Sequence, residues 1–148
     1  MDLQLANKVY IVTGGAKGIG AAISKAIAAE KGIVLIAGRK KADNQAIVDE
    51  IIKSGGKAAS VAVELAQPEA CKEVIDFTVE KYGRIDGLIN NAGVNDGVGL
   101  ESGNPEAFME SLQKNLSHYY NLAHYALPHL KSTKGSIVNI GSKVSVTG

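Results

Sequence analysis

The sequence of 148 residues predicts one α/β domain built on a doubly wound parallel sheet. Three observations support this prediction. Short β-branched apolar runs alternate with longer segments of helical periodicity, four times in succession. The first run, 9–13, is apolar on both faces, as a strand buried in a parallel sheet requires. A glycine cluster then lies where this run passes into the first helical segment, in a chain with 17 glycines.

The individual elements follow from local signals. Strands are expected at 9–13, 33–37, 58–63, 86–90 and 136–140. The first helix is expected to begin near Ile19 and to stop before Gly32, and the second to begin at Asp43 as its N-cap. A third helix is expected from Pro68 to Gly83. A long fourth helix is expected over Glu106–Lys131, with Pro128 bending its last turn.

Composition excludes several classes of protein. Sixteen lysines and arginines against 15 aspartates and glutamates leave a net charge of +1, which argues against a nucleic-acid or polybasic membrane binder. No apolar run approaches the roughly 20 residues that span a bilayer, and the start lacks a secretory signal pattern. The single cysteine, Cys71, fits a core position and a reducing, cytoplasmic compartment. The spacing of His118, His124 and His129 argues against a metal site.

The glycine cluster carries the strongest chemical signal. Gly14, Gly18 and Gly20 lie between a buried strand and a helix start. Glycine permits positive φ and close backbone approach to a pyrophosphate, and the helix N-terminus offers free N–H groups to an anion. No Gly-Lys-Ser/Thr triplet ends the turn, which excludes a P-loop. Glycines that merely permit close packing are the alternative interpretation.

Two motifs together resemble the short-chain dehydrogenase/reductase family. The stretch Thr13–Gly20 is similar to its cofactor motif, and Asn90-Asn91-Ala92-Gly93 matches its second signature. The resemblance extends over all 148 residues in order and spacing. It implies a Rossmann-type fold, here ending after the fifth strand, that binds a nicotinamide dinucleotide over residues 1–148. Cofactor contacts are implied for Gly14, Lys17, Gly18, Ile19, Gly20, Arg39, Glu64, Leu65, Asn91, Ala92 and Gly93.

The end of the second expected strand bears on the choice between NADP and NAD. Arg39 at this position offers a bidentate donor suited to a 2′-phosphate. Lys17 in the glycine turn is placed to reach the same phosphate, so NADP is preferred over NAD. The alternative is that Arg39 and its lysine neighbours form a solvated loop. The family usually places an aspartate after the third strand to contact the adenine amino group, whereas this chain has Glu64, which leaves that contact open.

Catalytic roles are implied for two residues. Asn115 lies inside the expected long helix, where asparagine has no propensity advantage. By resemblance it holds a water in a proton relay, and a solvent-facing asparagine is the alternative. Ser142 follows the fifth strand at the carboxyl end of the sheet, where ligands bind in such folds. By resemblance its hydroxyl contacts the oxygen of the reacting carbon, and a simple turn serine is the alternative.

The family's Tyr-x-x-x-Lys pair is missing, because no tyrosine in the chain has a lysine four residues later. We expect either the front part of a longer enzyme or a half-domain that binds a dinucleotide without catalysis. The run 137–140 reads as a central strand that would otherwise be a bare hydrophobic edge, which favours the first explanation. The 148 residues alone are expected to be inactive.

The substrate and assembly follow from the last segments. Asn95, Asp96 and Glu101 supply polar groups suited to a polyhydroxylated ligand. The runs around them resemble the bacterial L-fucose dehydrogenases of the family, which implies oxidation of a sugar's anomeric hydroxyl to a lactone. A 3-oxoacyl or hydroxysteroid reductase is the rival within the family. The Glu106–Lys131 helix is apolar around much of its circumference, which predicts a homo-oligomer.

Overall fold

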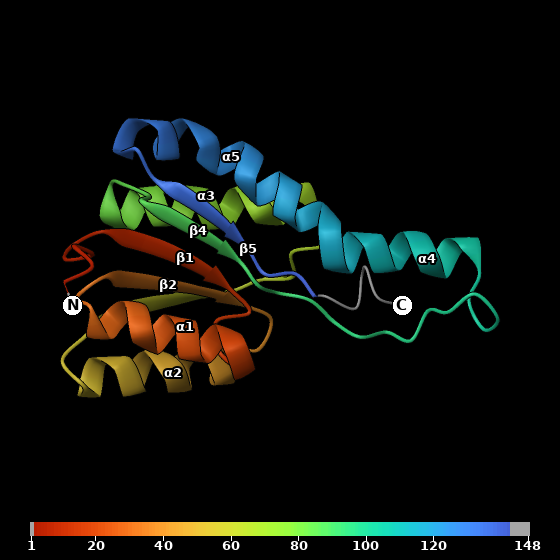
Figure 1. The fold of residues 1–148 in the computed structure, drawn as a ribbon, viewed down its shortest axis with the longest axis horizontal. Coiled ribbons are helices and arrows are strands. Elements are labelled where there is room, and N and C mark those ends of the chain that lie inside the picture. The colour runs from red at the N-terminus through yellow and green to blue at the C-terminus, as the bar shows by residue number, and fades with distance from the viewer. Residues whose placement is uncertain (1, 143–148) are drawn as a thin grey trace.

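The computed structural model describes residues 2–142. Its centre is a five-stranded, all-parallel sheet in the order β3-β2-β1-β4-β5 (Figure 1). The strands are β1 (Val9–Thr13), β2 (Ile33–Gly38), β3 (Lys57–Ala62), β4 (Gly87–Asn90) and β5 (Ser136–Asn139). The order reverses between β2 and β4, on the two sides of β1, which is the point where open α/β sheets bind ligands. The predicted doubly wound fold is confirmed.

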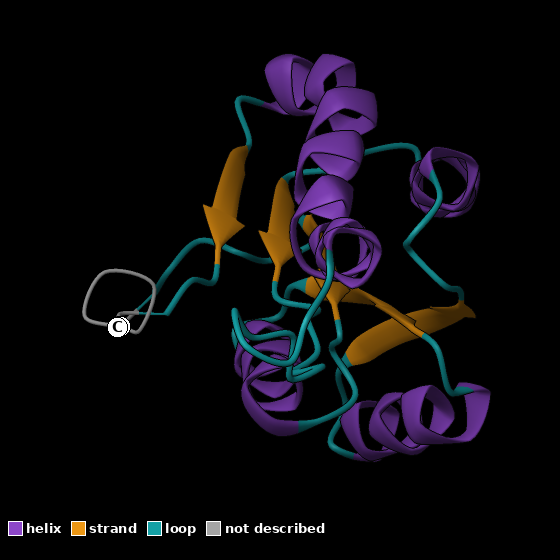
Figure 2. Cartoon of the chain, turned by 90° about the vertical axis from the view of Figure 1, so that its right-hand side faces the viewer, coloured by secondary structure: helices purple, strands orange, loops and turns teal. Residues whose placement is uncertain are grey.

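Helices cover both faces of the sheet (Figures 1 and 2). One face carries α1 (Gly18–Ala29) and α2 (Lys41–Lys53), and the other carries α3 (Pro68–Tyr82) and the helical run that ends in α5 (His118–Thr133). Successive side chains of β1 point to opposite faces of the sheet: Ile11 packs in the core beneath α3 and α5, and Val12 packs in the core beneath α1 and α2. Both are fully buried, which explains why the strand is apolar throughout.

The second helix begins earlier than predicted. Helix α2 starts at Lys41, and its N-cap residue is Lys40, whose side chain makes no capping hydrogen bond. Asp43 therefore lies inside the first turn, and its prediction as N-cap was wrong. The carboxylate still benefits from the helix N-terminus, and it pairs with Lys17 across the chain.

The predicted long helix is one run of three segments. Asn104 caps its start by accepting a hydrogen bond from the Ala107 N–H at 2.8 Å. Helix α4 (Pro105–Leu112) passes into the π-helical segment η1 (Gln113–Ser117), and α5 then continues to Thr133, with Pro128 inside it. π-helical turns inserted into α-helices occur often at functional sites, and this one contains Asn115.

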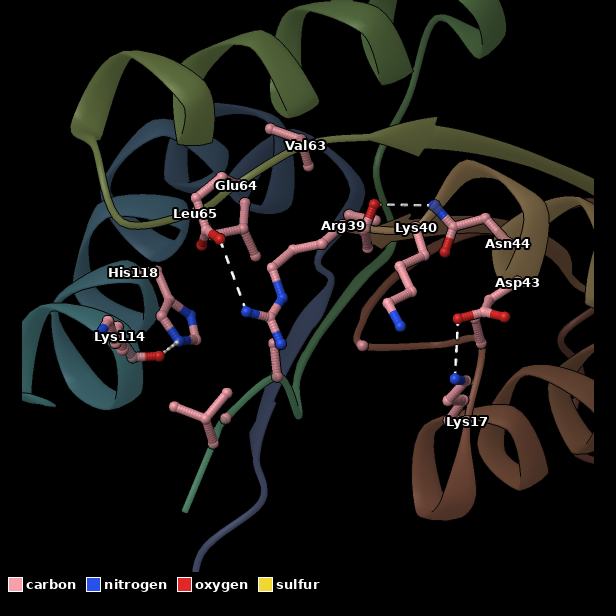
Figure 3. A pocket seen from close by; sticks show the side chains of 17 residues that line it. Lys17, Arg39, Lys40, Asp43, Asn44, Val63, Glu64, Leu65, Lys114 and His118 are labelled. Atoms are coloured by element: carbon pink, nitrogen blue, oxygen red, sulfur yellow. Dashed lines mark hydrogen bonds and ion pairs between the residues drawn. The ribbon is translucent and has the colours of Figure 1, made fainter. Parts of the chain in front are cut away.

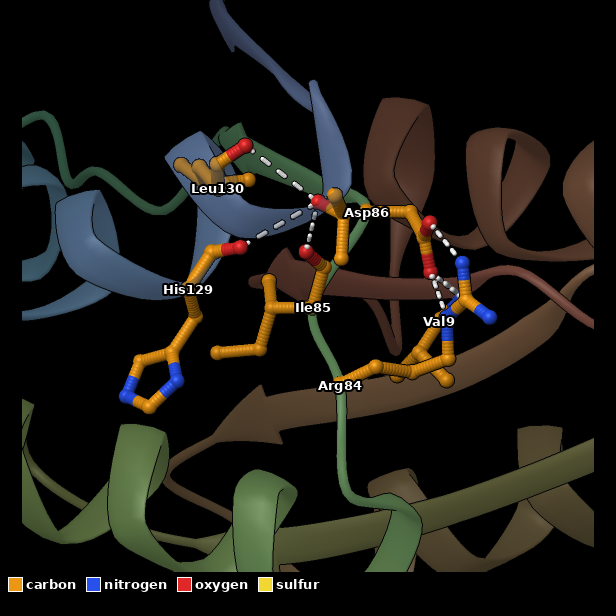
Figure 4. A network of polar contacts seen from close by, with 7 residues as sticks. Val9, Arg84, Ile85, Asp86, His129 and Leu130 are labelled. Atoms are coloured by element: carbon orange, nitrogen blue, oxygen red, sulfur yellow. Dashed lines mark hydrogen bonds and ion pairs between the residues drawn. The ribbon is translucent and has the colours of Figure 1, made fainter.

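The amino ends of the strands are joined by a buried carboxylate (Figure 4). Asp86 Oδ2 accepts the Val9 N–H at 2.9 Å, and Arg84 donates to both Asp86 oxygens at 2.8 and 2.7 Å. Burial raises the pKa of the Asp86 carboxyl, but the hydrogen bonds from Arg84 and Val9 outweigh it and leave that pKa below its ordinary value. The network fixes β1 against β4 at the end of the sheet opposite the site.

Strand β5 is an open edge among the described residues. It pairs with β4 on one side, and all four of its residues are exposed. Ile137 and Val138 are 39% and 48% exposed, although their β-branched side chains are those of an interior strand. Such an edge is a site for pairing with further chain.

Candidate functional site

A pocket of about 320 Å³ opens at the carboxyl end of the sheet (Figure 3). It is bounded by the β1–α1 turn, the ends of β2 and β3, the segment after β4 and the η1–α5 junction. Seven of the predicted cofactor residues line it: Gly14, Lys17, Arg39, Glu64, Leu65, Ala92 and Gly93. The four others, Gly18, Ile19, Gly20 and Asn91, belong to the turn and the helix start beside it or contact that turn.

The glycines of the turn allow a tight backbone geometry and close packing of the turn against α1. Gly14 has φ of +62°, in the left-handed region that side chains disfavour. Gly20 has no room for a side chain, because an added Cβ would lie 2.2 Å from the Gly14 carbonyl oxygen. The α1 N-terminus is thereby drawn against the turn, with its first N–H groups unpaired within the helix. This arrangement is suited to an anionic phosphate.

Thr13 joins this turn to the segment after β4, and the sequence reasoning assigned it no role. Its buried hydroxyl oxygen accepts the N–H groups of Asn91 and Ala92, both at 2.9 Å. The Asn91 side-chain amide donates in return to the Thr13 carbonyl at 3.0 Å. The alternative that Asn91 is an ordinary turn asparagine does not fit these bonds across 78 residues of chain. A hydroxyl at the end of an otherwise apolar strand was the available signal.

Charged side chains stand around the mouth of the pocket. Lys17 Nζ lies 2.8 Å from Asp43 Oδ2, and Arg39 Nη1 lies 3.8 Å from Glu64 Oε2 (Figure 3). The hydrogen bond from Lys17 holds the pKa of the Asp43 carboxyl below its ordinary value. Both sides of the Arg39–Glu64 pair are more than 60% exposed, so the pair is weak and leaves the guanidinium available to a ligand. Lys40 adds a further cation to this wall.

Asn44 is a second residue that the sequence reasoning missed. It is buried on the inner side of α2, and its amide donates to the Gly38 carbonyl at 2.8 Å and to the Val61 carbonyl at 3.2 Å. These bonds fix the ends of β2 and β3 against α2. They hold Arg39, the next residue after β2, at the pocket edge. A polar residue on the apolar stripe of a helix was the signal that could have revealed it.

The predicted catalytic asparagine lies at the far side of the site and is held firmly. Asn115 Oδ1 accepts the Val94 N–H at 2.7 Å, and its amide donates to Ser111 Oγ at 3.4 Å. Ser111 in turn donates to Asp96 at 3.1 Å. Asn115 is half-buried rather than facing solvent, which the alternative interpretation required. Asp96 is thus connected to Asn115, whereas Asn95 bonds the local Gly97 N–H.

Ser142 lies three residues beyond β5, at the same carboxyl edge of the sheet, and is exposed. The structure places it outside the pocket lining, and its catalytic role stays a prediction. Two side-chain bonds order the strand before it: the Asn90 amide donates to Asn139 at 2.9 Å, and the Tyr119 hydroxyl donates to the Ile140 carbonyl at 3.0 Å. Residues 143–148, which complete the predicted serine loop, lie outside the described part of the chain.

Residues 2–142 offer neither a metal site nor a membrane-spanning helix. No group of three histidine, cysteine, aspartate or glutamate side chains stands close enough to hold a metal ion. None of the described helices combines the length and apolar character needed to cross a membrane. Cys71 is buried in the core, where desolvation raises the pKa of its thiol to about 11, so it is unreactive.

Comparison with known proteins agrees with this geometry. The family model described as short chain dehydrogenase matches residues 8–148. Over 146 residues, the chain is 33% identical to an L-fucose dehydrogenase of Rattus norvegicus, covering 98% of this chain and 53% of that one. It is 37% identical to a 7alpha-hydroxysteroid dehydrogenase of Bacteroides fragilis, covering 95% and 56% respectively. A crystal structure of a metagenomic short-chain oxidoreductase in complex with NADP superimposes with a TM-score of 0.87 at 32% identity, covering 93% of this chain and 63% of that one. The chain thus spans little more than half of the length of these curated relatives.

Proposed function

Because the chain belongs to the short-chain dehydrogenase family of nicotinamide dinucleotide-binding oxidoreductases, we propose that it is the cofactor-binding part of an NADP-preferring dehydrogenase that oxidises a sugar hydroxyl. The observation that carries the proposal is one pocket with the glycine turn at one side and Arg39 at the other. The dinucleotide supplies the hydride acceptor. The protein binds its phosphates at the turn and the α1 N-terminus.

The preference for NADP rests on the charges at the end of β2. The Arg39 guanidinium is exposed and weakly paired, so a 2′-phosphate can replace Glu64 as its partner. NAD binding would instead favour an acidic residue that accepts the ribose hydroxyls at this place. NAD is retained as the second cofactor, since Glu64 stands nearby and can accept such hydroxyls.

The sugar substrate is supported by the polar segment between β4 and α4. Asn95, Asp96 and Glu101 are all exposed there, and Asp96 is oriented by Ser111 toward the Asn115 end of the site. An apolar substrate would desolvate these groups without replacing their hydrogen bonds. The similarity to an L-fucose dehydrogenase supports an aldose, oxidised at C1 to the lactone.

A hydroxysteroid or 3-oxoacyl substrate is the second candidate. It is favoured by the similarity to a 7alpha-hydroxysteroid dehydrogenase and by Leu100, a fully exposed leucine in the same polar segment. A third candidate, a dinucleotide-binding module without catalysis, is consistent with the absence of a Tyr-x-x-x-Lys pair from the 148 residues.

The helical run on the outer layer is proposed as the contact between identical subunits. Phe108, Met109, Leu116 and Tyr120 are each more than half exposed along it. Exposed apolar groups that follow one helical run are typical of an interface. A monomer in light scattering of a chain extended to the length of its relatives would contradict this assembly.

An activity assay separates the candidates. A chain extended to the length of its relatives is mixed with NADP and either L-fucose or a 7α-hydroxysteroid, and NADPH formation is followed. Reduction of NADP by the sugar, lost in Ser142→Ala and in Asn115→Ala, supports the proposal. Turnover of the steroid alone supports the second candidate, and turnover of neither supports the binding module. The 148 residues alone should give no turnover.

A further inference from the structure

The strongest feature outside the residues assigned so far is a buried histidine at the pocket wall. His118, the first residue of α5, is 1% exposed and lines the pocket. Its Nε2 lies 3.0 Å from the Lys114 carbonyl oxygen. A carbonyl only accepts, so Nε2 carries the proton and Nδ1 presents a lone pair. Burial lowers the pKa of the imidazole, which keeps this neutral tautomer at pH 7.

Nδ1 of His118 has no hydrogen-bond partner among the described residues, although it is buried. A buried acceptor without a donor is unfavourable and rare in folded proteins. In Figure 3 the ring extends from its helix beside Leu65 and Glu64, on the side of the pocket opposite Asn44. The ring is also fixed by an edge-on contact with Tyr119, at 4.9 Å between centroids. The protein therefore holds a rigid, unsatisfied acceptor at a ligand pocket.

The position of this acceptor indicates which ligand group it meets. The phosphates belong at the glycine turn and the adenosine ribose at the end of β2. In the family, the residue after the third strand usually contacts the adenine amino group, which puts the base toward the end of β3. Val63 and Leu65, which follow β3, contribute apolar surface to the pocket lining there, suited to a flat ring. Glu64 is 61% exposed, so its carboxylate is largely solvated.

Resting on the proposed dinucleotide function, we propose that His118 Nδ1 accepts a hydrogen bond from the 6-amino group of adenine. The histidine would thereby recognise adenine through the amino group that the family usually contacts with an aspartate, at whose position this chain has Glu64. A base that carries an oxygen at position 6 places a second acceptor against the Nδ1 lone pair, so the site binds hypoxanthine less tightly than adenine.

The test compares NADP with its hypoxanthine analogue by titration calorimetry on the 148-residue chain. Wild type should bind NADP roughly tenfold more tightly than the analogue, the ratio expected for one buried hydrogen bond. His118→Leu removes the acceptor at similar volume; it should weaken NADP binding and bring the two affinities within about twofold. His118→Asn, whose amide offers either an acceptor or a donor, should equalise the two ligands while keeping NADP affinity.

The readout is a ratio within each variant, so a partly unfolded sample changes both affinities alike. Lys72→Ala serves as the control, since Lys72 lies on α3 outside the pocket lining and pairs with Asp76 there; it should keep the wild-type ratio. The proposal is overturned if wild type binds both ligands equally, or if both His118 variants keep the wild-type ratio. Wild type that binds neither ligand overturns the dinucleotide function as well, which distinguishes the two failures.

Discussion

The hydroxyl of Thr13 gives the sharpest prediction for stability, because it connects β1 to the segment after β4. Thr13→Val replaces the hydroxyl by a methyl group of almost the same size. It leaves the Asn91 and Ala92 N–H groups without the acceptor they both reach at 2.9 Å. Two unsatisfied donors cost about 1–3 kcal/mol each when buried. Since both residues are only half-buried, we expect about 2–4 kcal/mol in total.

The assay is urea unfolding followed by circular dichroism, with Thr13→Ser as the matched control. Serine keeps the hydroxyl and loses one buried methyl, at a cost of about 1 kcal/mol. The free energy of unfolding should therefore be lower for Thr13→Val than for Thr13→Ser by at least 1 kcal/mol. Equal stability of the two variants, at unchanged m-value, would refute the role assigned to the hydroxyl.

Three further changes test other parts of the structure. Gly20→Ala should abolish dinucleotide binding and lower Tm, because its Cβ would collide with the Gly14 carbonyl. A variant with wild-type dinucleotide binding and wild-type Tm would contradict the close packing of the turn against α1. Asp86→Asn should make Tm fall less steeply as the pH is lowered. Because the pKa of Asp86 is lower in the folded protein than in the unfolded chain, the ionised carboxylate stabilises the fold above about pH 4, and this stabilisation is lost as the pH falls further. If Tm of Asp86→Asn falls between pH 7 and pH 2 as steeply as Tm of wild type, the stabilising role of the Asp86 carboxylate is contradicted. In an extended chain, Tyr120→Glu should shift the mass measured by light scattering toward the monomer, whereas the exposed Lys53→Glu should not.

The strands of the sheet were predictable because their signals are local, whereas their order was seen only in the structure. Strand β1 was placed correctly at both ends, since apolar residues on both faces admit few interpretations, and glycines marked the turn after it. The start of α2 was misplaced because Lys40 and Lys41 carry no capping chemistry, while Asp43 does. The π-helical segment has no residue signature, since it is a shift in backbone pairing within a continuous helix.

The site was predicted where a motif names its residues and missed where partners are distant in sequence. Thr13 meets Asn91 across 78 residues, and no local pattern announces that contact. Asn44 and His118 appeared as polar residues on helices, and only the fold shows that one ties two strand ends and the other faces a pocket. Burial decides both roles, and burial is a property of the assembled sheet.

The central claim is that the pocket binds a dinucleotide and that Arg39 selects its 2′-phosphate. The direct measurement is the dissociation constant of NADP and of NAD for the 148-residue chain, for wild type and for Arg39→Ala. Wild type should prefer NADP by roughly tenfold or more, and Arg39→Ala should lose most of that preference while NAD binding changes little. Tighter binding of NAD by wild type, or a preference for NADP that survives in Arg39→Ala, would contradict the account.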